Sequence, residues 1–414
     1  MAPLTAPSAA MTRDGALTRF HVRLLVLAVL LLVTDGYDTQ AIGYVAPVLS
    51  GLWHLGGGSF GPVFSAGLLG LMLGAMALTP LADRIGARRV LLGCLCVYAT
   101  LTLATAFAPS RAALLWLRFF TGLGLGGAMP SAIALVASHA PVRRRSLMVA
   151  VTVCGFSLGG ALGGAVAAAI IPRFGWQSVF VIGAAVPLAT LPALFAWLPE
   201  SPPPSGAATT APPFPVRLLF TQGHAGPTLL IWTAFFCNLL LLYFLANWLP
   251  SVVHASGLSV AAANLATAVY QGSGTLGALV LAAVADRTGR AQPVLACAFL
   301  GAAACIALLG AGTAVPALMA GAAGAGFCVI GGQIAANAFT GAHYPPAMRA
   351  TGVGWALGMG RLGSVFGPLI GGVLIDLDVS TPTLFRLFAA PALLAALCIL
   401  LVRPPRPPHG TALP

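Results

Sequence analysis

Long apolar stretches follow one another along the chain, separated by short polar segments. Each stretch reaches roughly 18 residues or more, enough for an α-helix to cross a hydrocarbon core about 30 Å thick. Over such lengths in lipid, a helix satisfies all of its own backbone hydrogen bonds. The pattern predicts an all-α integral membrane protein with twelve spanning helices, at residues 22–49, 60–82, 90–108, 112–138, 146–171, 177–198, 227–252, 260–284, 292–312, 314–340, 350–376 and 383–402.

The clearest interruption of this pattern is PESPPPSGAATTAPPFPVR at residues 199–217, which is rich in Pro, Ala and Thr. Such a composition is typical of a semi-extended linker rather than of a folded domain. It separates six predicted spans from six. We therefore expect five segments: an N-terminal tail at 1–21, an N-terminal six-helix bundle at 22–198, a linker at 199–226, a C-terminal six-helix bundle at 227–402 and a C-terminal tail at 403–414.

The two predicted bundles are also related in sequence. LADRIGARR at 81–89 follows the second span, and VADRTGR at 284–290 follows the eighth. GFSLGGALGG at 155–164 corresponds to GSVFGPLIGG at 363–372, with four glycines at one constant spacing. Parallel halves related by an axis along the membrane normal occur in secondary transporters, which bind their cargo between the halves.

Composition and charge support the membrane assignment. The chain is 59% hydrophobic and 7% charged, whereas a soluble domain has about 25% charged residues. Its basic residues are all Arg, and in loops they gather on one side, which the positive-inside rule makes cytoplasmic. The net charge of +12 therefore reflects topology and lipid contact, not nucleic-acid binding. We expect both termini and the linker in the cytoplasm of a bacterial-type inner membrane. Only Arg111, Arg173 and Arg386 fall in loops on the other side.

The sequence predicts no metal site and no organic cofactor. All eight cysteines fall inside apolar stretches, where a free Cys behaves as a small hydrophobe. The G-x-G-x-x-G pattern at 122–127 lies inside a predicted span, whereas a dinucleotide site needs a preceding strand. The histidines are scattered, and there is no nucleophile elbow. We therefore do not expect an enzyme.

Four ionisable residues lie well inside predicted spans: Asp35, Asp38, Arg118 and Arg361. Each costs at least about 2.5–3.5 kcal/mol at a helix centre, so a functional role is the default interpretation. Asp35 and Asp38 are three residues apart and share a helix face. Because two ionised carboxylates repel strongly in a low dielectric, we expect the pair to hold an exchangeable proton. A purely structural role for both is the alternative.

Arg361 is the best candidate for binding an anionic cargo. It lies about eleven residues into its span, which corresponds to a depth of roughly 16 Å and so to the midplane. A planar guanidinium binds a carboxylate through two parallel hydrogen bonds, a geometry that Lys does not reproduce.

Several of these motifs resemble a known family. The DR-x-G-x-RR loop with its second-half echo is similar to the major facilitator superfamily. Within it, DGYDTQAIGYVAPVL, RFFTGLGLGGAMPSAIAL at 118–135 and RATGVGWALGMGRLGSVFGPLIGG at 349–372 resemble the aromatic acid:proton symporter family. The superfamily loop normally begins with Gly four residues before its Asp, where this chain has Thr79.

The resemblance implies two pseudo-symmetric six-helix bundles and proton-coupled import of a small aromatic carboxylate by alternating access. It implies a substrate or coupling role for Arg361, and either proton coupling or helix bracing for Arg118. It also favours an ion pair that holds the inner gate shut, formed by loop residues whose alternative role is topology alone. The loop residues are Asp83, Arg84, Gly86, Arg88, Arg89, Asp286, Arg287 and Gly289.

An aromatic acid needs ring-sized apolar walls and a few polar groups. The spans offer Tyr37, Trp248, Tyr270, Gln333 and Asn337 as substrate-binding candidates, although aromatic residues in membrane helices commonly serve packing. Gln333 and Asn337 share a helix face. Further possible contributors are Asn238, Tyr243, Asn247, Gln271 and Trp355.

Alternatives remain open for cargo, proton number and direction. Benzoate, hydroxybenzoates, hydroxyphenylpropionates and muconates all fit, as does either one or two protons per cargo. The rival function is a proton-driven antiporter that exports small organic compounds. Exporters of this fold usually carry a Pro in the fifth-span glycine motif, where this chain has Gly160, so import is favoured. We expect a monomer whose partners are its cargo and the lipid bilayer.

Overall fold

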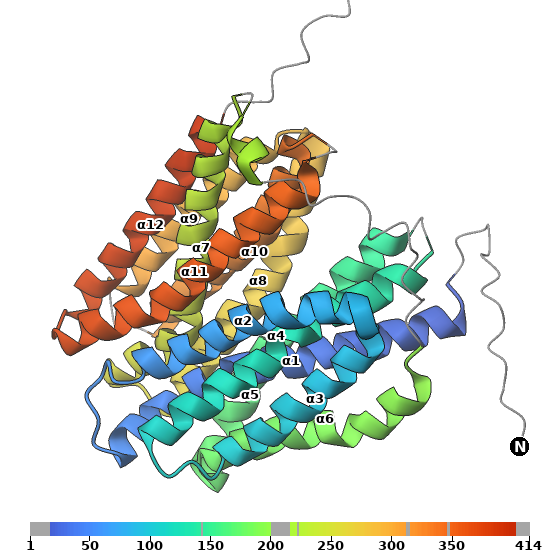
Figure 1. Ribbon diagram of the computed structural model, residues 1–414. Coiled ribbons are helices and arrows are strands. Elements are labelled where there is room, and N and C mark those ends of the chain that lie inside the picture. The colour runs from blue at the N-terminus through green and yellow to red at the C-terminus, as the bar shows by residue number, and fades with distance from the viewer. Residues whose placement is uncertain are drawn as a thin grey trace, which may run out of the picture.

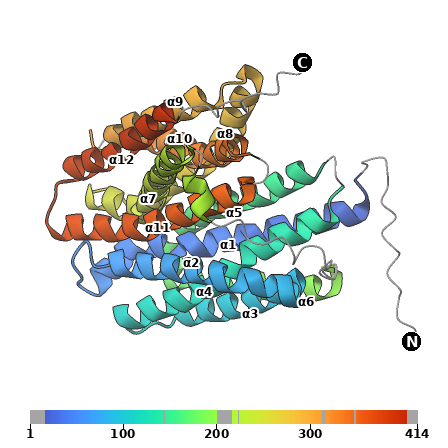
Figure 2. The same cartoon turned by 45° about the horizontal axis from the view of Figure 1, so that its top comes forward.

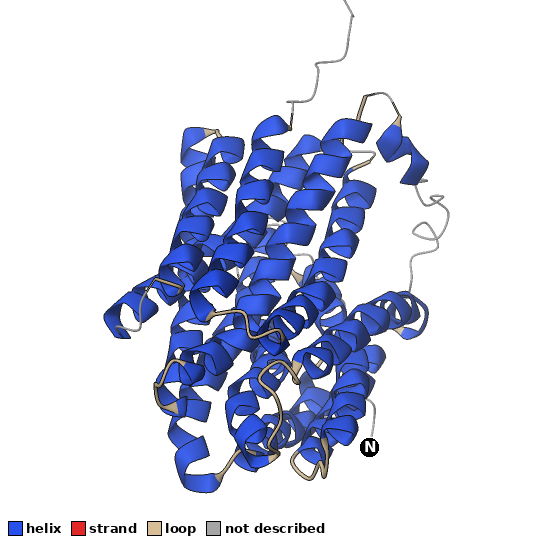
Figure 3. Cartoon of the chain, turned by 90° about the vertical axis from the view of Figure 1, so that its left-hand side faces the viewer, coloured by secondary structure: helices blue, strands red, loops and turns tan. Residues whose placement is uncertain are grey.

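The computed structural model describes residues 17–141, 144–199, 216–221, 223–311, 315–345 and 348–402. This part of the chain consists of helices joined by short loops (Figure 3). The helices are α1 (Arg19–Leu52), α2 (Gly61–Ile85), α3 (Ala87–Thr105), α4 (Arg111–His139), α5 (Arg145–Phe174), α6 (Gln177–Trp197), η2 (Val216–Phe220), α7 (Ala225–Ala255), α8 (Val260–Thr288), α9 (Ala291–Leu309), α10 (Val315–His343), α11 (Arg349–Asp376) and α12 (Thr381–Leu401).

The prediction of twelve membrane-spanning helices is confirmed, because α1 to α12 are all long and apolar enough to cross a bilayer. Their ends differ from the predicted ones by no more than four residues. The predicted tails at 1–21 and 403–414 and the linker at 199–226 lie wholly or largely outside the described residues. η2 belongs to that linker, and the Thr228 hydroxyl of α7 donates to the Leu219 carbonyl within it, at 3.0 Å.

The helices form two bundles of six, as the fold prediction required. Helices α1 to α6 pack mainly on one another, and so do α7 to α12 (Figure 1). Contacts between the bundles run mainly through three helix pairs, α1 with α7, α2 with α11 and α5 with α8, with fewer between α1 and α8. α10 packs on α7, α8, α9 and α11, so it lies among helices that themselves touch the N-terminal bundle (Figure 2).

The bundles are closed at one end and diverge at the other (Figure 1). At the closed end, the Gly58 backbone N–H donates to the Asp376 carboxylate at 2.9 Å, joining the α1–α2 loop to the end of α11. The Ser65 hydroxyl of α2 donates to the Val365 carbonyl of α11 at 2.7 Å. The ring of Phe64 meets Trp248 edge-on, with their centroids 5.0 Å apart. These contacts seal the end that carries the α1–α2 loop.

Two glycines shape the loops that carry the repeated DR-x-G motif. Gly86 joins α2 to α3 with φ 97°, and Gly289 ends α8 with φ 63°. Residues with a Cβ rarely adopt positive φ. The glycine of the motif is therefore required by the backbone in both halves, which gives the internal repeat a structural reason.

Candidate functional site

The segment TDGYDTQ does not interrupt α1, which runs as a helix through both aspartates. Asp35 and Asp38 are buried, with 2% and 1% of their surfaces exposed. Gly36 between them lies against the backbone of Phe156, so α1 approaches α5 closely at this point. A side chain there would push the helices apart, so the small residue permits the close contact of α1 and α5 beside the two carboxylates.

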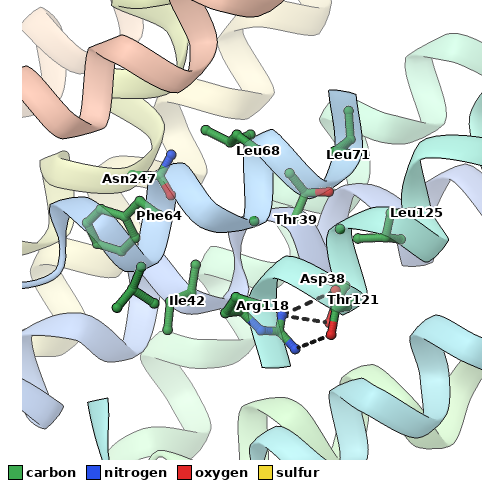
Figure 4. Close-up of a pocket in the computed structure, with 13 residues that line it drawn as sticks. Asp38, Thr39, Ile42, Phe64, Leu68, Leu71, Arg118, Thr121, Leu125 and Asn247 are labelled. Atoms are coloured by element: carbon green, nitrogen blue, oxygen red, sulfur yellow. Dashed lines mark hydrogen bonds and ion pairs between the residues drawn. The ribbon is translucent and has the colours of Figure 1, made fainter. Parts of the chain in front are cut away.

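Asp38 is paired with Arg118 inside the N-terminal bundle (Figure 4). A guanidinium nitrogen lies 3.3 Å from the carboxylate, and the Thr102 hydroxyl of α3 donates to the same carboxylate at 2.6 Å. The other end of the Arg118 guanidinium donates to Thr105 at 2.7 Å and to Thr121 at 3.2 Å. Its carbon lies 5.2 Å from the centre of the Phe180 ring. The pair is enclosed, and hydrogen bonds reach both charged groups, as a buried ion pair requires, although the Arg118 Nε has no partner among the described residues.

Asp35 is in a different situation. Its carboxylate accepts one hydrogen bond, from the Thr39 hydroxyl at 3.3 Å. Among the described residues no cation is in contact with it. Arg361 of α11, in the other bundle, interacts with it electrostatically at longer range. The two aspartates of one helix face thus differ, since Asp38 is paired with a cation of its own bundle and Asp35 has no cation in contact among the described residues.

Arg361 is half-buried and only partly engaged. One guanidinium nitrogen donates to the Tyr243 hydroxyl of α7 at 3.2 Å. Gly360 and Gly363 on either side of it lie against the α7 backbone and side chains near Leu239, and this close packing fixes its level in the bundle. No further acceptor for its N–H groups lies within the ranges that the structure covers. These groups are available to a carboxylate.

A narrow pocket extends from the Asp38–Arg118 pair toward the C-terminal bundle (Figure 4). Its polar lining comprises Asp38, Thr39, Arg118, Thr121 and Asn247, the last of which belongs to α7. Its other walls are apolar side chains of α1, α2 and α4 and two glycines, Gly67 and Gly122. The pocket combines apolar walls with a few polar groups, which is the usual composition of a site for a small organic molecule.

Gln333 and Asn337 lie side by side on α10, as their spacing predicts. The Gln333 amide nitrogen donates to the Asn337 side-chain oxygen at 3.3 Å. Asn238 of α7 donates to the Gln333 oxygen at 2.9 Å. The three amides form a connected chain between α7 and α10.

The three aromatic candidates use their polar groups in packing. The Tyr37 hydroxyl donates to the Val179 carbonyl of α6 at 3.0 Å, inside the N-terminal bundle. The Tyr270 hydroxyl donates to the Leu242 carbonyl at 3.2 Å, and the Trp248 indole N–H donates to the Pro368 carbonyl at 2.8 Å. Because each polar group is bonded to a backbone carbonyl, this geometry favours a structural role for all three residues. Trp355 stacks on Trp232, away from the charged groups.

The loop residues expected to form a gate lie on the ends of the bundles that diverge. Arg84, Arg89, Asp286 and Arg287 are exposed. Arg88 donates to the Phe195 carbonyl at 2.6 Å, within its own bundle. The side chain of Asp83 lies outside the described residues.

Sequence reasoning missed the three threonines and the Phe180 ring that surround Asp38 and Arg118. Thr102 and Thr105 are three residues apart in a largely apolar span, a spacing that places two hydroxyls on one face of α3. The sequence shows this spacing, but it does not show which side chain the two hydroxyls contact.

Comparison with known proteins agrees with these observations. The family model "Major Facilitator Superfamily" matches residues 28–263 and 231–413. A gallate transporter of Pseudomonas putida is 40% identical over 91% of this chain and 90% of its own length. The 4-hydroxybenzoate transporter PcaK of the same organism is 35% identical over 93% of both chains. A 3-(3-hydroxy-phenyl)propionate transporter of Escherichia coli is 35% identical over 91% of this chain and 92% of its own.

Solved structures agree on the fold. The nucleoside transporter NupG superposes with a TM-score of 0.77 at 17% identity, covering 92% of this chain and 99% of that one. A bacterial homologue of the lysosomal transporter Spinster, in an inward-facing and unoccupied conformation, gives 0.69 at 15% identity, covering 94% and 95%. The chain belongs to the Major Facilitator Superfamily, a family of transporters, and within it is related to bacterial proteins named as transporters of aromatic acids.

Proposed function

We propose that this protein imports a small aromatic carboxylate together with protons, by alternating access around the gap between its two bundles. One observation carries the proposal: Asp35 is a buried carboxylate with no cation in contact among the described residues, and Arg361 of the other bundle acts on it electrostatically. The relatives named for gallate, 4-hydroxybenzoate and hydroxyphenylpropionate support an aromatic acid as the cargo.

Arg361 supplies the site for the cargo's carboxylate. Its guanidinium keeps free N–H groups, and the Tyr243 hydroxyl that it contacts holds it at one level of α11. A bound anion beside Arg361 weakens the attraction between Arg361 and the Asp35 carboxylate. Asp35 therefore binds a proton more readily when cargo is bound than when the site is empty.

Asp38 and Arg118 form the second part of the proton path. Asp38 accepts from Thr102 as well as from Arg118. A proton that binds this carboxylate neutralises its charge and breaks the ion pair with Arg118. Loss of the ion pair frees Arg118 and loosens the contact between α1 and α4. One proton per monoanion makes transport electroneutral, whereas two protons add a charge worth about 2.3 kcal/mol per 100 mV.

The open end of the gap faces the cytoplasm in this proposal, with both termini on that side of an inner membrane. The arginines of the loops support this orientation through the positive-inside rule. The conformation described is then the one that releases cargo into the cell, closed on the outside by Gly58, Ser65 and their partners on α11.

The proposal is tested by uptake of labelled benzoate, hydroxybenzoates, gallate and hydroxyphenylpropionate into proteoliposomes, with an inward proton gradient and a protonophore as control. We expect gradient-dependent accumulation of at least one acid. Asp35→Asn and Asp38→Asn should each abolish accumulation, and Arg361→Lys should raise KM about tenfold, since it loses one of two charge-assisted hydrogen bonds. If the acids instead leave preloaded vesicles against their own gradient, the protein is an exporter and the proposal is wrong.

A further inference from the structure

The three amides that connect α7 to α10 have a fixed direction. Asn238 Nδ2 donates both to the Val329 carbonyl at 3.2 Å and to the Gln333 oxygen at 2.9 Å. A carbonyl oxygen only accepts hydrogen bonds, so Asn238 must turn its nitrogen toward Val329. Gln333 must then offer its oxygen to Asn238 and its nitrogen to Asn337, at 3.3 Å. Reversal of the chain would bring the Asn238 oxygen against the Val329 oxygen.

The two ends of this chain of amides differ in what they offer. Asn238 is 1% exposed, and its side-chain oxygen has no partner among the described residues. Asn337 is half-buried, and its oxygen is taken by Gln333. The side-chain nitrogen of Asn337 has no hydrogen-bond acceptor in the parts of the chain that the structure covers. The chain of amides therefore presents a hydrogen-bond donor at its accessible end.

This accessible end belongs to α10, which packs on both α7 and α11, the helices that carry Tyr243 and Arg361. Gly360 and Gly363 abut Leu239 and Leu240 of α7, so Arg361 and Asn238 lie at one level of the C-terminal bundle. α10 lies between α8 and α11, which both touch the N-terminal bundle. Within residues 333–338 of α10, Ile334, Asn337 and Ala338 are less buried than their neighbours.

We propose that Asn337 donates a hydrogen bond to an oxygen substituent on the ring of the cargo, while Arg361 holds the carboxylate. Gln333 and Asn238 are positioning residues that keep the Asn337 nitrogen turned toward the cargo. This inference rests on the proposed function. It assigns the cargo to aromatic acids whose ring carries a hydrogen-bond acceptor, such as a hydroxyl oxygen, and disfavours acids with a bare ring or with a substituent that only donates.

The wild-type protein provides the first test, by kcat/KM for benzoate and for its 3- and 4-hydroxy and 3- and 4-amino derivatives in proteoliposomes. An amino group has nearly the size of a hydroxyl, but its nitrogen shares its lone pair with the ring and accepts poorly. We expect the better hydroxy acid to exceed benzoate about tenfold, the worth of one hydrogen bond, and its amino analogue to resemble benzoate. Equal transport of the hydroxy and amino acids would overturn the assignment.

Variants separate recognition from structure. Asn337→Leu should remove the advantage of the hydroxy acid over benzoate. Gln333→Leu keeps Asn337 but frees its amide to turn, so the amino acid should gain relative to the hydroxy acid. Thr340→Val is the matched control, because the Thr340 hydroxyl donates to the Ala336 carbonyl of its own helix at 2.8 Å, and it should leave both ratios unchanged.

The outcomes distinguish this inference from the function on which it rests. If Asn337→Leu lowers transport of all the acids alike, the residue is structural and the inference fails while acid transport stands. If Asn337→Leu does not fold, Gln333→Leu provides the test through its ratio of kcat/KM for the amino acid to kcat/KM for the hydroxy acid. A ratio equal to that of the wild-type protein refutes the inference. If the wild-type protein accumulates none of the acids, the proposed function itself fails.

Discussion

The two aspartates of α1 should respond differently to the same substitution. Asp38→Asn leaves Arg118 buried without a counter-ion, since both side chains are at most 4% exposed. Removal of one partner of a buried ion pair costs about 3–5 kcal/mol. Thr105, Thr121 and the Phe180 ring still contact the guanidinium, and a desolvated cation–π contact returns up to about 2 kcal/mol.

We therefore expect Asp38→Asn to lower the free energy of unfolding by about 3 kcal/mol, toward the low end of the cost of a broken buried pair. Asp35→Asn is the matched control, with the same chemistry one helical turn away. Asp35 has only the 3.3 Å hydrogen bond from Thr39 and no cation in contact among the described residues. Its loss of stability should stay below about 1 kcal/mol. Both variants should lose proton-driven accumulation.

The assay is thermal unfolding of the purified variants in one detergent, alongside uptake in proteoliposomes. The double variant Asp38→Asn with Arg118→Gln removes both charges and should recover most of the stability lost by Asp38→Asn alone, without recovering accumulation. Equal instability of Asp35→Asn and Asp38→Asn would refute the different roles given to the two carboxylates. Proton-driven uptake by the double variant would refute the part assigned to the ion pair.

Three further predictions concern the surroundings of the site. Thr102→Val removes the 2.6 Å hydrogen bond to Asp38 and should cost about 1–2 kcal/mol, read as a lower unfolding midpoint, whereas an unchanged midpoint would mean that this bond contributes nothing. Gly86→Ala forces a Cβ into φ 97° and should cost about 1–2 kcal/mol, while Gly93→Ala at an uncrowded helical position should not destabilise. Asp376→Ala removes the acceptor of the Gly58 N–H and should cost about 1 kcal/mol. This loss should shift the population roughly fivefold toward opening of the closed end. Hydrogen exchange of the α1–α2 loop measures the shift, and unchanged exchange would contradict the prediction.

The fold could be predicted from the sequence because its physical cause is local. Each span is long and apolar by itself, and lipid leaves a helix as the solution. The same logic identified Asp35, Asp38, Arg118 and Arg361, since a charge at such depth is costly wherever its partner lies. Neither inference required knowledge of which helices touch.

The partners of these charges could not be predicted for the opposite reason. Arg118 meets Asp38 across 80 residues of sequence, and the choice of Asp38 over Asp35 depends on how α1 is rotated between α3, α4 and α5. The aromatic candidates show the same limit. Tyr37 and Tyr270 are as polar as any binding residue, and only the packed structure shows that their hydroxyls bond to the Val179 and Leu242 carbonyls.

The placement of the charges suggests where coupling must arise. Asp38, Arg118 and the threonines around them belong to one bundle, so their distances need not change when the bundles move as units. Asp35 and Arg361 belong to different bundles, and their interaction changes whenever the gap opens or closes. A ligand shifts a conformational equilibrium only by the difference in its affinity for the two states. Within the proposed function, a proton on Asp35 and an anion on Arg361 both weaken the attraction between these two side chains. Each therefore changes the binding affinity of the other by the same factor.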